Sequence, residues 1–587
     1  MIGVIALVAG DIAQTEIPKY LGEIVDGIED SSLSTERLWV ILGIVLAYAG
    51  VILVARIVWR LSIFYASRHI EAGLRHDMFE KAERLPVSYY RENKVGKVMA
   101  WFTTDIETIG EFFGWGTVML IDAFFLSVIV IIRMILVDGA LTLLAGVPIL
   151  LIAGWGLLVE RFMSQKWEER QKAYDELYDF AQENFTGIRV IKAFVKENKE
   201  IHAFAKVAKK NADVNYSFGK ISILFDLVIE VIIYMIIAII LGFGGWFVFA
   251  TVQREPVQIF GSSILLTVGQ LVEFTSYFDI LIWPMIALGQ VIAMRSRSKA
   301  SLKRITVFLD APETIKSPDD AIVLENPQGA VKFEHFSFRY PDDGNDEDAL
   351  NDLTFSIKPG ERVGVVGKIG SGKSTLANIL LRLYNYEEGK VFIDGIDLMK
   401  IDLDSLREAV AYAPQDNFLF SDTIANNIAF SADEVDEDKV IAAAQFADID
   451  SNIKDFPKKY ETVSGERGVT LSGGQKQRIS LARAYYKHSP ILLMDDTVSA
   501  VDVKTEETIL HNVIEKRQGL TTIVIASRVS TVRHFDKILV LVDGKAEAFG
   551  THDELMETSP AYQKMVYLQQ LEAEVQEGGK TWTKMKN

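Results

Sequence analysis

Long apolar runs fill the first half of the chain and are absent from the second half. About 20 consecutive apolar residues are needed to cross a bilayer as an α-helix. Five runs have this character: residues 38–65, 117–136, 141–158, 221–250 and 264–294. A sixth run, residues 1–10, is apolar but short, and Asp11, Gln14 and Glu16 follow it. We therefore expect six membrane spans, the first of which is truncated in this sequence.

Basic residues predict which connections between the runs face the cytoplasm. Lysines and arginines gather after the runs at 38–65 and 141–158, among them Arg75, Arg84 and Arg91 after the first. The connections on the other side, residues 28–36, 137–139 and 251–256, carry one basic residue, Arg254. By the positive-inside tendency, the long connections and the C-terminal half are cytoplasmic.

Composition adds domain boundaries to this picture. The apolar half gives way to charged, mixed sequence after Val331, in a chain of 587 residues. The formal net charge of −18 argues against a nucleic-acid partner, and the absence of cysteine excludes disulfides and Cys-ligated metal sites. We expect a transmembrane domain at 1–305, a linker at 306–330, a globular domain at 331–570 and a C-terminal tail at 571–587.

A glycine-rich stretch, GKIGSGKS at residues 367–374, lies between an apolar run at 363–366 and a predicted helix at 376–384. It fits G-x-x-x-x-G-K-[ST] at every fixed position. The glycines allow backbone N–H groups to surround phosphate oxygens at a helix N-terminus. Lys373 would reach the β- and γ-phosphates, and the Ser374 hydroxyl would ligate Mg²⁺. The stretch therefore predicts a nucleotide site.

The stretch ILLMDDTVSAVD at 491–502 supplies an acidic companion to this loop. Its first four residues predict a buried parallel strand, which ends on Asp495 and Asp496. Asp495 would hold Mg²⁺ through water. Together the two stretches predict a P-loop nucleotide hydrolase and leave its kind open.

A second glycine-rich helix start, LSGGQKQR at 471–478, narrows the kind of hydrolase. Ser472, Gly473 and Gly474 would make a second anion-binding helix N-terminus. One nucleotide needs one phosphate cradle, so the second cradle makes sense if it closes over ATP held by another chain. Here the sequence resembles the ATP-binding cassette (ABC) family, whose signature motif this is.

The resemblance continues along nearly all of the chain. Tyr340 in FSFRYP is similar to the aromatic residue that stacks on adenine, and Gln415 in APQDNFLF is similar to the Q-loop glutamine that touches Mg²⁺. SGERG at 464–468 and SAVD at 499–502 resemble the X-loop and the D-loop, and IPKYLGEIVDGI resembles the first span of an exporter. The resemblance implies a multi-domain membrane protein with an all-α, six-helix transmembrane domain followed by an α/β P-loop nucleotide-binding domain, the ATP-binding cassette.

The resemblance also implies which residues form the nucleotide sites. ATP would be bound by Tyr340, Gly367, Gly370, Ser371, Gly372, Lys373, Ser374 and Thr375. Mg²⁺ would be held by Ser374, Gln415 and Asp495. The partner's ATP would be contacted by Ser472, Gly473, Gly474 and Gln475.

Two positions depart from the family pattern. The acid after the Mg²⁺ aspartate is normally glutamate, the general base, and here it is Asp496. One methylene fewer shortens its reach by roughly 1.5 Å, and a positioned base contributes about 10²–10⁴ in rate. The residue before Arg528 in TTIVIASRVSTV is normally the switch histidine, and here it is Ser527. We interpret Asp496, Ser527 and Gln415 as the catalytic positions of a degenerate site.

An impaired site beside an intact signature is typical of one half of a heterodimer. We expect a multidrug-type exporter subunit in the cell membrane, with a cytoplasmic cassette and hydrolysis mainly at the partner's site. The partner would be a homologous half-transporter with a consensus Walker B glutamate and switch histidine. Two alternatives stay open: a slow homodimeric exporter of lipid or drug, and an ATP-gated regulatory membrane subunit that does not pump.

Acidic residues within the spans predict the kind of substrate. Asp226 and Glu230 are four residues apart and share a helix face, and Glu273 and Tyr277 share another. Acidic residues in a bilayer are costly and usually face protein or a water-filled space. They predict hydrophobic, including cationic, small-molecule substrates, although headgroup depth or pairing with a partner chain would explain them equally well.

Overall fold

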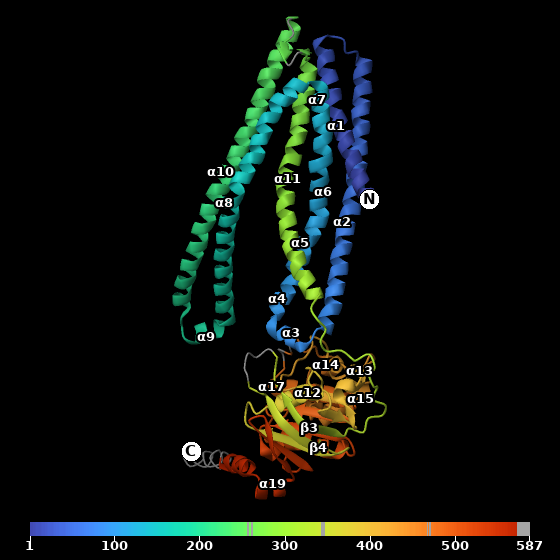
Figure 1. The fold of residues 1–587 in the computed structure, drawn as a ribbon, viewed down its shortest axis with the longest axis vertical. Helices are drawn as coiled ribbons and strands as arrows, with labels where there is room; N and C mark the ends of the chain where they lie inside the picture. The colour runs from blue at the N-terminus through green and yellow to red at the C-terminus, as the bar shows by residue number, and fades with distance from the viewer. Residues whose placement is uncertain (255–256, 260–261, 342–346, 466–467, 469–470, 572–587) are drawn as a thin grey trace. The chain divides into compact units, whose positions relative to one another are not determined.

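The computed structural model describes the whole chain except residues 255–256, 260–261, 342–346, 466–467, 469–470 and 572–587 (Figure 1). Contacts divide the chain into two units. The helical unit comprises Met1–Phe79 and Met99–Asp310, and the α/β unit comprises Glu80–Val98 and Ala311–Asn587. The connection after the second apolar run, residues 80–98, therefore belongs with the C-terminal half rather than with the spans.

Long helices build the helical unit (Figure 1). Its main helices are α1 (Ile2–Glu29), α2 (Thr35–Arg84), α4 (Val95–Ala100), α5 (Ile106–Glu111), α6 (Thr117–Ile121), α7 (Ser127–Val137), α8 (Gly139–Thr186), α9 (Ile188–Ala193), α10 (Glu197–Val252) and α11 (Val268–Leu309). Three π-helical turns join α4 to α7 into one rod: η1 (Trp101–Asp105), η2 (Phe112–Gly116) and η3 (Asp122–Leu126). A short antiparallel pair, β1 (Val257–Ile259) and β2 (Ser262–Ile264), precedes α11.

Each predicted span lies largely within a helix. Among the described residues, four helices are long and apolar enough to cross a membrane: Thr35–Arg84, Val95–Val137, Glu197–Val252 and Val268–Leu309. The run expected at 264–294 starts too early, because Ile264 belongs to β2 and the side chain of Thr267 caps α11. The first run continues as helix to Glu29, straight through Asp11. The number of six spans stays a prediction.

Helices α1 and α11 approach closely enough to require glycine on both sides. A Cβ added at Gly269 would lie 2.1 Å from the carbonyl oxygen of Gly22, and one added at Gly22 would lie 2.7 Å from that of Gly269. Asp26 fixes the register of this contact. Its carboxylate accepts hydrogen bonds from the Gly269 N–H at 2.6 Å and from the Thr267 hydroxyl at 2.7 Å. The end of α1 is thus attached to the beginning of α11.

Two sheets form the centre of the α/β unit. The larger sheet has the order β12-β11-β5-β10-β9-β8, and the smaller has the order β4-β3-β6-β7. Their strands are β3 (Val331–Phe338), β4 (Leu350–Ile357), β5 (Arg362–Gly367), β6 (Val391–Ile393), β7 (Ile396–Asp397), β8 (Val410–Ala413), β9 (Ile491–Asp495), β10 (Thr521–Ala526), β11 (Lys537–Val542) and β12 (Lys545–Gly550). Strands β8, β9, β10, β5 and β11 are parallel, and β12 is antiparallel at the edge.

The helices of this unit vary in length. They are α3 (Val87–Glu92), α12 (Lys373–Leu380), α13 (Leu403–Ala409), α14 (Ile424–Ile428), α15 (Glu437–Phe446), α16 (Asp450–Lys454), α17 (Gly473–Tyr486), α18 (Val503–Lys516) and α19 (His552–Thr558), and residues 560–571 are also helical. Helix α12 starts at Lys373, three residues earlier than the predicted helix, because Gly372 adopts a left-handed conformation immediately before it.

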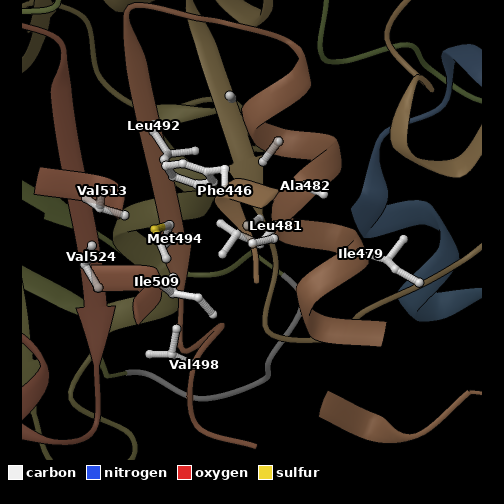
Figure 2. Close-up of a cluster of buried hydrophobic side chains, with 14 of the residues drawn as sticks. Phe446, Ile479, Leu481, Ala482, Leu492, Met494, Val498, Ile509, Val513 and Val524 are labelled. Atoms are coloured by element: carbon white, nitrogen blue, oxygen red, sulfur yellow. The ribbon is translucent and has the colours of Figure 1, made fainter. Parts of the chain in front are cut away.

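Burial on both faces explains why the central strands are apolar. All residues of β9 and β10 are buried, as a parallel sheet covered by helices requires. Figure 2 shows one side of this core, where Phe446, Leu481, Met494 and Ile509 converge. The predicted buried strand at 491–494 is therefore confirmed. Because β5, β10 and β9 are parallel neighbours, the residues that follow each of them meet at one edge of the sheet.

Phe446 provides a test of this core. Its ring is fully buried and stacks on Tyr485 with a centroid distance of 3.8 Å. We expect Phe446→Ala to lower the unfolding temperature of the α/β unit by on the order of 10 °C, because a Phe-to-Ala cavity costs about 3–5 kcal/mol. The exposed Val503 is the control, and Val503→Ala should shift the transition by less than about 2 °C. Scanning calorimetry of the purified chain would measure both, and equal shifts would contradict the packing described.

Candidate functional site

Glycines at three positions give the 367–374 loop its path between β5 and α12. Gly370 and Gly372 have φ angles of +83° and +92°, in the region that favours glycine. A Cβ at Gly372 would lie 2.6 Å from the Ala349 carbonyl oxygen, and one at Gly367 would lie 2.4 Å from the Leu541 carbonyl oxygen. The loop therefore has the tight backbone path that a phosphate cradle needs.

Lys373 lies inside the curve of this loop. Its Nζ donates hydrogen bonds to the carbonyl oxygens of Gly367 and Lys368, both at 2.8 Å. Burial lowers the pKa of Lys373, and the charges of Asp496 and Asp495 act in the opposite direction. The hydroxyl of Ser371 is buried and has no hydrogen-bond partner among the described residues. A cation and an unpaired donor thus face the interior of the loop, which fits a phosphate group.

Tyr340 lies beside the loop and is fixed by it. Its hydroxyl donates a hydrogen bond to Thr375 Oγ1 at 3.1 Å and accepts one from Asn378 Nδ2 at 3.1 Å. Its ring meets that of Tyr384 edge-on at 5.1 Å. The Arg91 guanidinium, from α3, lies 5.2 Å from the centroid of the Tyr340 ring, within range of a cation–π interaction. The ring is thereby held in one orientation.

The two aspartates at the end of β9 have different environments. Asp495 is buried, and burial raises the pKa of its carboxyl, while hydrogen bonds from the Ser374 and Tyr412 hydroxyls act in the opposite direction. Asp496 follows in a left-handed conformation with φ of 47°, and its N–H donates to the Ile525 carbonyl oxygen at 2.9 Å. The chain therefore turns sharply away from the sheet at Asp496.

Ser527 and Asp496 contact each other directly. The Ser527 hydroxyl, immediately after β10, donates a hydrogen bond to Asp496 Oδ1 at 3.2 Å. The two positions at which the sequence departs from the family pattern are thus hydrogen-bonded side chains in one site. Sequence reasoning placed both residues in the site but did not anticipate this bond.

A cavity of about 600 Å³ joins these groups into one site. Gln415, which is exposed, also lines it, as do Gly370, Gly372 and Ile369 of the loop. Ser374, Gln415 and Asp495 would supply three oxygen ligands of the kind that Mg²⁺ prefers. The cavity therefore collects most of the residues proposed to bind ATP and Mg²⁺ from a single chain.

The signature residues lie elsewhere. Helix α17 starts after Ser472, whose hydroxyl accepts from the Gln475 N–H at 3.3 Å, while Gln475 Oε1 accepts from the Ser472 N–H at 2.9 Å. Gly473 lines a different cavity of about 520 Å³, beside Asn417 and Ala500. In the described part of the chain, no residue from 472 to 475 lines the cavity at Lys373. This helix start is therefore formed but not used by the site of its own chain.

The acidic residues of the helical unit divide into two kinds. Asp226 and Glu230 are exposed on α10. Glu273 instead accepts a hydrogen bond from the Tyr277 hydroxyl at 3.0 Å on α11. Asp122, in η3, is buried and accepts from Trp283 Nε1 at 2.9 Å. The four residues proposed to contact substrate are thus not gathered into one cluster.

Sequence reasoning missed two contacts that shape the nucleotide site. Arg91 was noted for its charge alone, and the positive-inside tendency that singled it out says nothing about Tyr340. Gln569 contacts the backbone on both sides of Arg528, through bonds to Ser527 and Val529. Nothing in the local sequence of either residue indicates its partner, because each contact joins segments far apart in the chain.

Comparisons with known proteins agree with this geometry. The ABC transporter transmembrane region matches residues 1–285, and the ABC transporter ATP-binding family matches residues 350–499. The probable multidrug resistance ABC transporter ATP-binding/permease protein YheI of Bacillus subtilis is 33% identical over 98% of this chain and 96% of that protein. The multidrug resistance-like ATP-binding protein MdlA of Escherichia coli is 34% identical over 95% of this chain and 92% of that protein.

A solved structure extends the likeness to three dimensions. A bacterial Atm1-family ABC exporter with ATP bound superposes with a TM-score of 0.78 at 27% identity, covering 97% of each chain. The helical unit is thus a transmembrane domain of a multi-pass cell-membrane protein, and the α/β unit is a cytoplasmic ATP-binding domain. The chain belongs to the ABC transporter family, as an ATP-driven exporter that carries both domains.

Proposed function

We propose that this chain is one subunit of a heterodimeric exporter of hydrophobic compounds, which binds ATP in a degenerate, poorly hydrolysing site. The observation that carries the proposal is the hydrogen bond from the Ser527 hydroxyl to Asp496 Oδ1 at 3.2 Å. A general base must come within about 2.6–3.2 Å of the proton that it removes. Asp496 is shorter than glutamate, and one of its oxygens is already engaged by the serine that replaces the switch histidine.

The binding half of the same site is complete, which supports retention of ATP. Lys373 is positioned in the loop, Tyr340 presents an oriented ring, and Ser374, Gln415 and Asp495 would hold Mg²⁺. Mg²⁺ bound there would neutralise phosphate charge. The residues that bind are thus intact, and those that would activate water are altered.

The signature helix supports the assignment of a partner chain. Ser472–Gln475 form a capped helix N-terminus outside their own chain's ATP cavity. Such a terminus stabilises negative charge that develops on a phosphate. We assign it to the ATP of a homologous half-transporter, which would carry the consensus glutamate and histidine.

The substrate assignment rests on the relatives and on the helical unit. Two relatives carry multidrug resistance in their names. Asp226 and Glu230 present carboxylates on one face of α10, and Glu273 and Tyr277 form a hydrogen-bonded pair on α11. Carboxylates and a phenol ring would attract cationic, hydrophobic compounds.

Removal of the carboxylate charge at Asp496 tests the catalytic assignment. We expect Asp496→Asn to change the ATPase rate of the assembled heterodimer by less than about twofold, because this group is not an effective base. The corresponding change of the partner's glutamate should remove nearly all activity. Steady-state phosphate release at saturating Mg-ATP measures both, and loss of turnover in Asp496→Asn would show that this site hydrolyses ATP.

A gain of function complements that loss. In a heterodimer whose partner glutamate has been replaced, Asp496→Glu combined with Ser527→His should restore measurable hydrolysis, since base and switch are then both present. Each single change is the control, and neither should restore the rate by itself. A double variant that stays inactive would place the defect outside these two side chains.

Lys373 tests retention at the degenerate site. Because its ammonium would pair with the β- and γ-phosphates, Lys373→Ala should release bound ATP at least about tenfold faster. Radiolabelled ATP would be trapped in the heterodimer and its loss followed after dilution into unlabelled ATP. If the slow fraction is unchanged, the retained nucleotide does not belong to this chain.

Gly473 tests the service of the signature to a partner. Among the described residues, a Cβ at Gly473 meets nothing within 4 Å, whereas one at Gly474 would approach the Ala500 carbonyl oxygen to 3.0 Å. Gly473→Ala should therefore leave the fold and its unfolding temperature unchanged. We nevertheless expect it to lower the ATPase rate of the heterodimer at least about tenfold, because the methyl group obstructs the approach to the partner's phosphate. Ser472→Arg should act in the same direction, and full activity in both variants would refute the division of labour.

A further inference from the structure

Residues 527–529, which we name the switch segment, are held by a side chain from the end of the described chain. Gln569 Oε1 accepts a hydrogen bond from the Val529 N–H at 2.8 Å. Gln569 Nε2 donates a hydrogen bond to the Ser527 carbonyl oxygen at 3.2 Å. Both halves of one side-chain amide thus pair with the backbone on either side of Arg528, as a neighbouring strand would.

The helix that delivers Gln569 is itself firmly attached. Tyr562, two turns earlier, is fully buried, and its hydroxyl lies 2.7 Å from His552 Nδ1. The Ser559 hydroxyl accepts from the Tyr562 N–H at 3.1 Å, and Met565 and Val566 pack against the core of the α/β unit. The position of the amide is therefore set by the core rather than by a loose tail.

The switch segment has a second attachment, through side chains alone. Glu506, on α18, is buried and accepts from the Thr531 hydroxyl at 2.5 Å, and its other oxygen lies 3.7 Å from Arg528 Nη1. Ser527 and Arg528 are exposed, and Ser527 lines the ATP cavity together with Lys373. The backbone at Ser527 therefore depends on Gln569 for its placement at the cavity wall.

We propose that Gln569 is a positioning residue of the nucleotide site, through which the C-terminal helix fixes the switch segment against bound ATP. The bond from Ser527 to Asp496 and the wall beside the phosphates then persist only while the amide remains paired. Slow release of ATP from this chain's site consequently depends on the C-terminal helix. This inference extends the proposed retention of ATP, and its test is chosen so that the two can fail separately.

The test compares two adjacent glutamines on one helix. Gln569→Ala removes both hydrogen bonds, and Gln569→Met removes them while keeping the length of the side chain. Gln570 is exposed, so Gln570→Ala is the matched control. Release of a non-hydrolysable ATP analogue from the assembled heterodimer, with the partner's P-loop lysine replaced, reports this chain's site whether or not it hydrolyses ATP.

We expect both Gln569 variants to release the analogue about tenfold faster than the wild type, as the loss of hydrogen bonds implies. Hydrogen exchange at the Val529 N–H should accelerate in the same variants. The unfolding temperature and the kcat of the partner's site should stay unchanged, and Gln570→Ala should match the wild type throughout. A general structural role would lower the unfolding temperature instead of changing release alone.

Three results would overturn the inference. Unchanged exchange at Val529 in both Gln569 variants would mean that the amide does not hold the segment in solution. Faster exchange with unchanged release would mean that the held segment does not control the nucleotide. A lowered unfolding temperature in both variants would reduce Gln569 to a stabilising residue. Hydrolysis at Asp496 would overturn the proposed function without affecting any of these comparisons.

Discussion

Parallel hydrogen bonding of β10 between β5 and β9 is the constraint on which the nucleotide site depends. The register pairs Ile525 with Asp495 on one side and Ala526 with Val366 on the other. Because parallel strands end at the same edge, the phosphate loop, the acid pair and Ser527 emerge together. Burial of all three strands fixes this register, since a slip of one residue would displace every apolar side chain from its place in the core.

The same framework separates binding from hydrolysis. The cradle depends on backbone geometry, glycines and one lysine, none of which is altered. Hydrolysis depends on the ends of two side chains, and a shorter acid with a serine beside it forms a stable pair that leaves less reach toward water. A site of this kind favours holding the nucleotide over turning it over. The unused helix start at Ser472 gives the chain a separate way to contribute to chemistry.

Much of this arrangement could be predicted from the sequence, because local patterns determine it. Apolar runs predicted the long helices, and the loop at 367–374 and the strand at 491–494 predicted the position of the phosphate site. Contacts between distant segments could not be predicted. The bond from Ser527 to Asp496 and the pairing of Arg91 with Tyr340 depend on tertiary placement. Gln569 is an ordinary helical glutamine in the sequence, and only the packing of Tyr562 brings it to the switch segment.

The close contact between α1 and α11 has a consequence for how the transmembrane domain can move. The backbones touch at Gly22 and Gly269, and the carboxylate of Asp26 pairs with the first turn of α11. Sliding one helix past the other would force backbone atoms into overlap, and separating them would strand a carboxylate without its donors. The two helices therefore behave as a single lever near these residues. Conformational change during a transport cycle must bend or rotate around this joint, and the distance across it stays constant throughout.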